Sequence, residues 1–202
     1  MRISISRHAL QRILRWTHRA LITLGVAVIG YCGFILADAW MFQKRANAEL
    51  DRRLEAKHAV PLAATITPPA VGADGLIGRI EVTRIGLSAV VFEGTDRKTL
   101  QRAAGHVADT AFPGQAGNIG IAGHRDTFFR PLRDIHQDDI VTLTTLRGEF
   151  RYRVVSARVV VPTEVSVLTP TENEVLTLVT CYPFYFVGSA PSRFIVRAER
   201  VL

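Results

Sequence analysis

The longest apolar run in the chain extends from Ala20 to Ala37 and contains no charged residue. Its eighteen residues approach the length that an α-helix needs to cross the hydrocarbon core of a membrane. Five arginines and no acidic residue precede the run, and Asp38 and Trp40 follow it. By the positive-inside rule, this pattern predicts a basic cytoplasmic segment at 1–19, a transmembrane anchor at 20–40 and export of the rest of the chain.

A cleaved signal peptide is the alternative interpretation of this segment. Residues 37–39 read Ala-Asp-Ala, which resembles a small-x-small cleavage site. The apolar run is longer than the hydrophobic region of an ordinary signal peptide, so the pattern favours an uncleaved anchor.

Residues 41–74 carry two further patterns. Helix-forming residues fill 41–58, with acidic side chains among Lys and Arg, which predicts a solvated helical stalk. Three prolines and two glycines then exclude regular structure between Pro61 and Gly75. We therefore expect a linker that ends near Asp74, followed by one folded domain at 75–202.

From Leu76 onward the hydrophobic pattern changes to short alternating runs, which are typical of β-strands. Short helical segments are expected only near 96–105 and 128–135. Seven or eight strands without a βαβ rhythm predict a mostly β fold, a closed or nearly closed and mostly antiparallel barrel. The clearest strands are expected at 77–82, 87–92, 117–124, 140–146, 150–161, 175–181 and 193–200.

Charge narrows the classes of function. The net charge is +7, but residues 1–74 contribute +5 and residues 75–202 only +2. A nucleic-acid-binding domain would carry its basic residues on the folded part, interleaved with aromatic side chains. The charge distribution therefore argues against a nucleic-acid partner.

The two cysteines lie in very different contexts. Cys32 falls inside the apolar run and Cys181 near the C-terminus, so a disulfide between them is not expected. In an exported domain, a lone thiol is either a buried structural cysteine or a reactive one.

Cys181 ends the segment Thr177-Leu-Val-Thr-Cys, just before Pro183 interrupts strand pairing. A nucleophile at a strand end is held rigidly by the hydrogen bonds of the sheet and is still accessible to solvent. His124 also ends an apolar strand, directly after Gly123, whose lack of a Cβ permits close backbone approach. Arg193 begins the last strand and shares a face with Arg197, but ~13 Å separates the two positions, so only one of them fits a compact site.

Together these segments resemble the sortase family. The resemblance rests on Cys181 in TLVTC, His124 in GHRDTFF and Arg193 twelve residues after the cysteine, and it looks closest to the class D sortases. It covers residues 75–202, and the predicted anchor and stalk also suit the family.

The resemblance implies an eight-stranded β-barrel that carries a cysteine transpeptidase site. Cys181 would attack the carbonyl after a threonine in an LPxTG-like sorting signal, and His124 would transfer protons. Arg193 would supply donors to the developing oxyanion or to the substrate backbone. The implied partners are an exported protein with a C-terminal sorting signal, an amine acceptor of the cell envelope or of a protein subunit, and the membrane. No cofactor or metal ion is expected.

Other residues have less defined roles. Asp126 is a candidate for orienting the His124 imidazole, and its alternatives are an ion pair with Arg125 or Arg130 or an N-cap. For substrate binding, we expect contributions from the loop at 162–173 and from the segment around the cysteine, where aromatic side chains could equally belong to the core. The candidate substrate-binding residues are Thr180, Tyr182, Phe184 and Val165.

Two other functions remain open at this stage. An anchored cysteine peptidase would share the acyl-enzyme and differ only in the nucleophile that resolves it. A non-catalytic barrel that binds envelope peptides would not need Cys181 at all.

Overall fold

The computed structural model describes residues 7–59, 70–186 and 188–201. The chain forms two compact units that divide between Met41 and Phe42. Residues 1–6 of the expected cytoplasmic segment and most of the expected Pro-rich linker lie outside the described residues.

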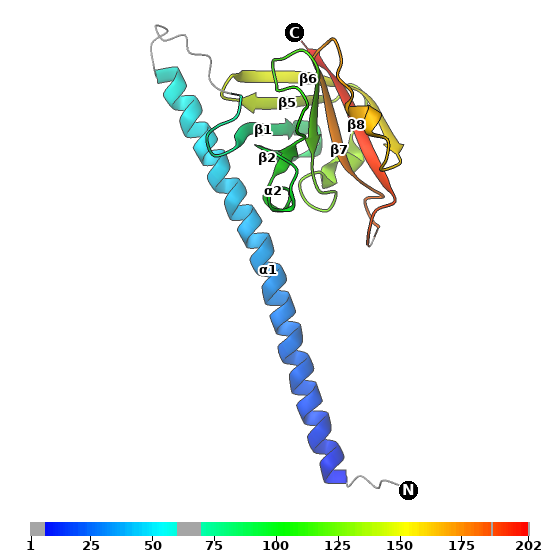
Figure 1. Ribbon diagram of the computed structural model, residues 1–202. Helices are drawn as coiled ribbons and strands as arrows, with labels where there is room; N and C mark the ends of the chain where they lie inside the picture. Colours follow the sequence, from blue (N-terminus) through cyan, green and yellow to red (C-terminus); the bar gives the residue numbers. More distant parts are fainter. Residues whose placement is uncertain (1–6, 60–69, 187, 202) are drawn as a thin grey trace. The chain divides into compact units, whose positions relative to one another are not determined.

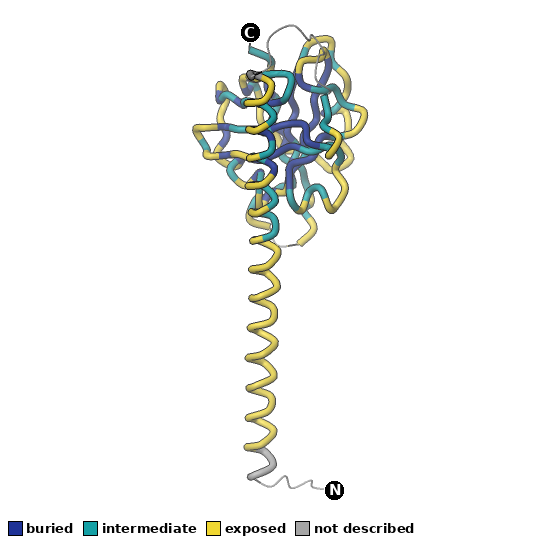
Figure 2. The backbone as a smooth tube through the Cα atoms, turned by 90° about the vertical axis from the view of Figure 1, so that its left-hand side faces the viewer, coloured by how far each residue is buried: buried dark blue, intermediate teal, exposed yellow. Residues whose placement is uncertain are grey.

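One long helix, α1 (Arg7–Ala59), contains both the apolar run and the expected stalk. Its sequence has no proline, and therefore nothing removes a helical hydrogen bond between the two segments. The large apolar residues between Leu21 and Trp40 are exposed, and Figure 2 colours this part of the tube mostly as exposed (yellow). The helix is long and apolar enough to cross a membrane.

The part of α1 that belongs to the second unit is amphipathic rather than fully solvated. Phe42, Ala46, Leu50 and Leu54 recur every four residues and share one helix face. Leu50 is fully buried and packs with Leu76 and Val90. The sequence predicted a solvated stalk here because the charged residues of the opposite face dominate the composition.

Gln43 adds a polar contact to this packing. Its side-chain amide accepts from the Val90 N–H at 3.0 Å and donates to the Arg102 carbonyl at 2.7 Å. The part of α1 from Phe42 onward thus satisfies backbone groups of β2 and α2 and belongs to the same folded unit as the barrel.

Eight strands close into a barrel in the order β1-β2-β3-β4-β7-β8-β6-β5 (Figure 1). This confirms the predicted mostly β barrel. The strands are β1 (Leu76–Val82), β2 (Leu87–Glu93), β3 (Ala104–His106), β4 (Asn118–Ala122), β5 (Ile140–Thr145), β6 (Gly148–Val160), β7 (Val175–Tyr182) and β8 (Ser192–Val201). The short helices are η1 (Thr83–Ile85), α2 (Arg97–Arg102), η2 (Arg130–Asp134) and η3 (Val165–Leu168).

Most strand pairs are antiparallel, as expected, but β3 was not expected, and the barrel also contains two parallel pairs. β3 replaces the end of the helix expected at 96–105, because the helix stops at Arg102 and three residues then pair with β2. Two strand pairs, β2–β3 and β4–β7, are parallel. The β4–β7 pair matters most, because it aligns the ends of two strands at the same edge of the barrel.

The barrel is filled by aliphatic side chains from most of its strands. Ile80, Ile121, Leu143, Leu178 and Val196 are among the buried members of this core. Figure 2 shows the buried residues gathered in the strands. A packed core of this kind holds strand ends in fixed positions, which a catalytic site requires.

Candidate active site

The register of β4 against β7 brings His124 and Cys181 together. The two strands run parallel, with Asn118 opposite Val175 and Ala122 opposite Val179. Continuing the same register by two residues places His124 level with Cys181. Both residues lie at the carboxyl ends of their strands, His124 exposed and Cys181 half-buried and free of any disulfide.

Gly123 fixes this alignment one residue before the histidine. Its N–H donates to the Val179 carbonyl at 3.1 Å, and its carbonyl accepts from the Thr180 hydroxyl at 2.7 Å. A Cβ at Gly123 would lie 2.8 Å from the buried Phe129 ring, so no larger residue fits without displacing the ring. The contacts explain why a glycine precedes His124 in the GH segment, and why a threonine precedes Cys181 in the TLVTC segment.

Arg193 reaches the same level from the neighbouring strand. In the antiparallel β7–β8 ladder, Cys181 is directly opposite Arg193, and residues in this relation have neighbouring side chains on one face of the sheet. Arg193 Nη1 donates to the carbonyls of Ala190 and Ser192 at 3.3 and 3.0 Å. Arg197 pairs instead with Thr177, four residues further along β8, and is absent from this group.

The three predicted catalytic side chains line one cavity of about 280 Å³. The β7–β8 loop forms its remaining wall through Gly188, Ser189 and Ala190. An open cavity that contains a thiol, an imidazole and a guanidinium offers a nucleophile, a proton carrier and a fixed positive donor.

Asp126 lies beside Arg125 rather than beside the imidazole. Its Oδ1 is 3.7 Å from Arg125 Nε, and its side chain is 75% exposed. Among the described residues, its carboxylate makes no hydrogen bond with His124. This arrangement corresponds to the ion pair that the sequence left open as an alternative, so the orienting role for Asp126 gains no support from the contacts.

The candidate substrate-binding residues fall in three different environments. Thr180 is buried, and its hydroxyl is committed to Gly123, which makes it a positioning residue for the histidine. Tyr182 and Phe184 are half-buried and pack with Phe194, at ring centroid distances of 6.2 and 5.4 Å. Val165 begins η3 and is 75% exposed.

The sequence did not single out Arg125 as a member of the site. It is 8% exposed and lines the same cavity as Cys181, and its Nη2 donates to the carbonyls of Phe186 and Gly188. Its position directly after His124 was the available signal. A charged residue next to a catalytic one is so common that this signal is weak on its own.

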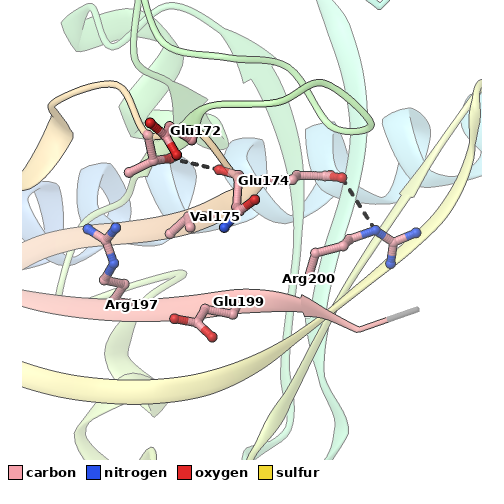
Figure 3. A pocket seen from close by; sticks show the side chains of 8 residues that line it. Glu172, Glu174, Val175, Arg197, Glu199 and Arg200 are labelled. Carbon is pink, nitrogen blue, oxygen red and sulfur yellow. Dashed lines mark hydrogen bonds and ion pairs between the residues drawn. The ribbon is translucent and has the colours of Figure 1, made fainter.

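A second cavity, of about 680 Å³, lies at the opposite end of β7 (Figure 3). Arg197 and Glu199 of β8 line it, and Glu174 faces Arg200, with 3.5 Å between the carboxylate and Nε. Glu174 also accepts from the Tyr152 hydroxyl at 2.5 Å. Burial, together with this carboxylate, raises the pKa of Tyr152, which stays a neutral donor. The contacts of Glu174, directly before β7, reach β6 and β8. The smaller cavity is the candidate active site because of the chemistry of its lining and not because of its size.

The comparisons with known proteins agree with this geometry. Residues 80–201 match the family model described as the sortase domain. The chain is 34% identical to Sortase D of Bacillus subtilis over 90% of this chain and 96% of that protein. It is 32% identical to Sortase A of Listeria monocytogenes over 54% of this chain and 50% of that protein.

Solved structures give the same result. A sortase D5 transpeptidase of Clostridium perfringens superposes with a TM-score of 0.66 at 26% identity, covering 80% of this chain and 99% of that one. The structure of Listeria monocytogenes sortase A superposes with a TM-score of 0.59 at 28% identity, covering 64% of this chain and 89% of that one. The match of residues 80–201 to the sortase domain and the 34% identity to Sortase D over most of the chain show that this barrel, with a thiol at the end of β7, belongs to the sortase family of cysteine transpeptidases.

Proposed function

We propose that Cys181, His124 and Arg193 carry the transpeptidation reaction of this sortase. The observation that carries the proposal is that the β4–β7 and β7–β8 registers place the three residues side by side at one edge of the barrel. All three side chains line one cavity, which also supports a shared role.

The reaction has two halves. In the first half, Cys181 Sγ attacks the carbonyl carbon of the scissile peptide bond, the C–N bond breaks, and the leaving amine takes a proton from the His124 imidazolium. In the second half, an amine attacks the thioester and gives a proton to His124. The C–S bond then breaks and returns the thiolate. Arg193 donates to the oxygen that becomes negative in both tetrahedral intermediates.

The proposed donor substrate is an exported protein with an LPxTG-like sorting signal near its C-terminus. The proposed acceptor is an amine of the cell envelope or of another protein subunit. Val165 and the half-buried Tyr182 and Phe184 are proposed to contact the apolar part of the signal, since they flank the end of β7 and the preceding loop.

The proposed location follows from α1. Residues 20–40 anchor the chain in a membrane, residues 1–19 stay in the cytoplasm, and residues 75–202 form the catalytic domain outside it, after a stalk and linker at 41–74. The exposed apolar face of α1 and the arginines that precede it support this topology.

Product analysis with and without an added amine tests the function. A sorting-signal peptide is incubated with the protein, and the products are separated by mass. Transpeptidation predicts a new peptide–amine product that grows with amine concentration at the expense of hydrolysis. An unchanged hydrolysis product would instead identify a peptidase, and full activity of Cys181→Ala would exclude both enzymes.

A further inference from the structure

Among the residues that the structure describes, Arg125 is a buried cation without a close anionic partner. Its side chain is 9% exposed, and its nearest carboxylate, Asp126, lies 3.7 Å away and is itself 75% exposed. Burial of a guanidinium is unfavourable unless it is well paired. The charge of Arg125 is thus only partly compensated by the protein.

Two kinds of neutral contact hold the guanidinium in place. Nη2 donates to the carbonyls of Phe186 and Gly188, at 2.7 and 3.1 Å, and Cζ lies 6.0 Å from the Phe186 ring centroid. These contacts tie the β7–β8 loop to the residue that directly follows His124. Arg125 therefore positions the wall of the cavity next to Cys181.

The other terminal nitrogen of the Arg125 guanidinium, Nη1, has a different environment. Nη1 is buried and has no hydrogen-bond partner among the described residues. Buried donors in folded proteins are nearly always satisfied by protein, water or a ligand, and one that lacks a protein partner beside a cavity is a candidate for binding a ligand atom. Arg125 lines that cavity together with Cys181, His124 and Arg193.

The charge balance indicates what kind of oxygen this donor binds. Arg125 and Arg193 are two permanent cations in the lining, against the single carboxylate of Asp126. In the reaction proposed above, Arg193 faces the oxyanion and His124 takes the proton of the incoming amine. Because Arg125 lines the same cavity as His124, its guanidinium is a candidate to hold an anionic group on that same amine.

We propose that Arg125 binds a carboxylate of the amine acceptor through Nη1 while its Nη2 holds the β7–β8 loop. This inference rests on the proposed function and deepens it, because it gives the acceptor a chemical class: a primary amine that carries a carboxylate within a few bonds. A guanidinium binds a carboxylate through charge-assisted hydrogen bonds, which are stronger than neutral ones.

The test compares acceptors that end in a carboxylate or in a neutral amide, and each kcat/KM is calculated per unprotonated amine, because a nearby carboxylate also raises the pKa of the amine. Glycine, diglycine and triglycine are each assayed against the corresponding C-terminal amide, with one sorting-signal peptide as donor. The readout is the ratio of kcat/KM for the acid to that for the amide at each length. Because the ratio is taken within one variant, any general loss of activity or of loop order cancels.

Arg133 provides a matched control. It holds the same loop from outside the cavity, where Nη1 donates to the Tyr185 hydroxyl at 2.7 Å and Cζ lies 5.7 Å from the ring centroid. Arg125→Gln and Arg133→Gln each remove one arginine contact with this loop, but only the first removes a donor from the cavity. Arg125→Lys keeps the charge and replaces Arg125→Gln if that variant does not fold.

The unmodified protein is expected to prefer the acid of at least one length by about tenfold, the scale of one charge-assisted hydrogen bond. Arg125→Gln should bring this ratio close to one, Arg125→Lys should retain part of it, and Arg133→Gln should leave it unchanged. Equal use of acids and amides by the unmodified protein, or an equal loss in both Gln variants, would overturn the inference. Failure of the proposed function looks different, because no amine-dependent product would form with any acceptor.

Discussion

Cys181 and Arg193 are directly opposite each other in the antiparallel ladder between β7 and β8. Because opposite residues share a face of the sheet, the sulfur and the guanidinium are held near one another by the backbone itself. Arg193 is further fixed by its hydrogen bonds to the Ala190 and Ser192 carbonyls. The pairing places Arg193, and not Arg197, in the cavity that contains Cys181.

This pairing predicts a large difference between two arginines on one strand. Arg193→Gln should lower kcat/KM for the sorting-signal peptide by about 100-fold or more, the usual cost of removing an oxyanion donor. Arg197→Gln should leave it nearly unchanged, because Arg197 pairs with Thr177 at the far part of the ladder. Steady-state kinetics on both variants measures the two losses. Similar losses in kcat/KM for the two variants would contradict the proposed role of Arg193.

The hydrogen bond from Thr180 to Gly123 is expected to position His124. Thr180→Val removes the hydroxyl and leaves the Gly123 carbonyl without its 2.7 Å partner. Loss of a buried hydrogen bond of this type costs about 1–3 kcal/mol. We expect a lower Tm together with a lower kcat.

Thr177→Val is the matched control for that variant. Thr177 is equally buried on the same strand, and its hydroxyl donates to Asn118 Oδ1 at 2.7 Å, away from the histidine. It should lower Tm by a similar amount while kcat stays close to that of the unmodified protein. If kcat fell in parallel with Tm in both variants, the positioning role of Thr180 would be disproved.

The stability of the barrel at low pH is predicted to depend on Asp139. Arg84 donates to this nearly buried carboxylate and, with the His136 N–H at 2.7 Å, holds its pKa below the ordinary value of 3.8. A lowered pKa in the folded state stabilises the protein above the unfolded-state pKa, and this contribution is lost as the pH falls through the folded-state pKa.

Asp139→Asn should therefore lower the free energy of unfolding by about 1–3 kcal/mol at pH 7. The difference from the unmodified protein should begin to shrink as the pH falls below about 4, the unfolded-state pKa, and should be lost only below the lowered folded-state pKa, where both side chains are neutral. Asp138→Asn is the control, since its side chain is 71% exposed and lies 3.8 Å from Arg153. Urea unfolding at several pH values measures both, and a deficit for Asp139→Asn that does not vary with pH would contradict the prediction.

The end of α1 is predicted to stabilise the catalytic unit. Leu50→Ala should cost about 2–5 kcal/mol, the range for a fully buried leucine, because Leu50 packs with Leu76 and Val90. Glu55→Ala, on the exposed face of the same segment, should cost almost nothing. Thermal unfolding compares the two, and an unchanged Tm for Leu50→Ala would show that the helix does not contribute to the folded unit.

The sequence predicts the parts of this fold that have strong local patterns. Alternation over 175–181 and the stop at Pro183 placed Cys181 at a strand end, and the structure has β7 end at Tyr182. β3 was missed because three residues are too few to show alternation. The buried face of α1 was missed because its apolar residues are diluted by charged ones.

The site was only partly predictable, because its geometry depends on contacts between segments that are distant in sequence. Residue types and the sortase resemblance selected Cys181, His124 and Arg193 as candidates. The parallel β4–β7 pairing that places His124 level with Cys181 is a non-local feature that no local pattern reveals. The burial of Thr180 and the unpaired Nη1 of Arg125 likewise depend on segments distant in sequence.

The proposed transpeptidation proceeds through an acyl-enzyme, a thioester on Cys181. Mass spectrometry of the intact protein, mixed with a sorting-signal peptide in the absence of an amine, measures it directly. We predict a mass increase equal to the acyl part of the peptide, located on Cys181 after digestion, removed by hydroxylamine and absent in Cys181→Ala. Cleavage of the peptide by Cys181→Ala, or an acyl group on any other residue, would contradict the account.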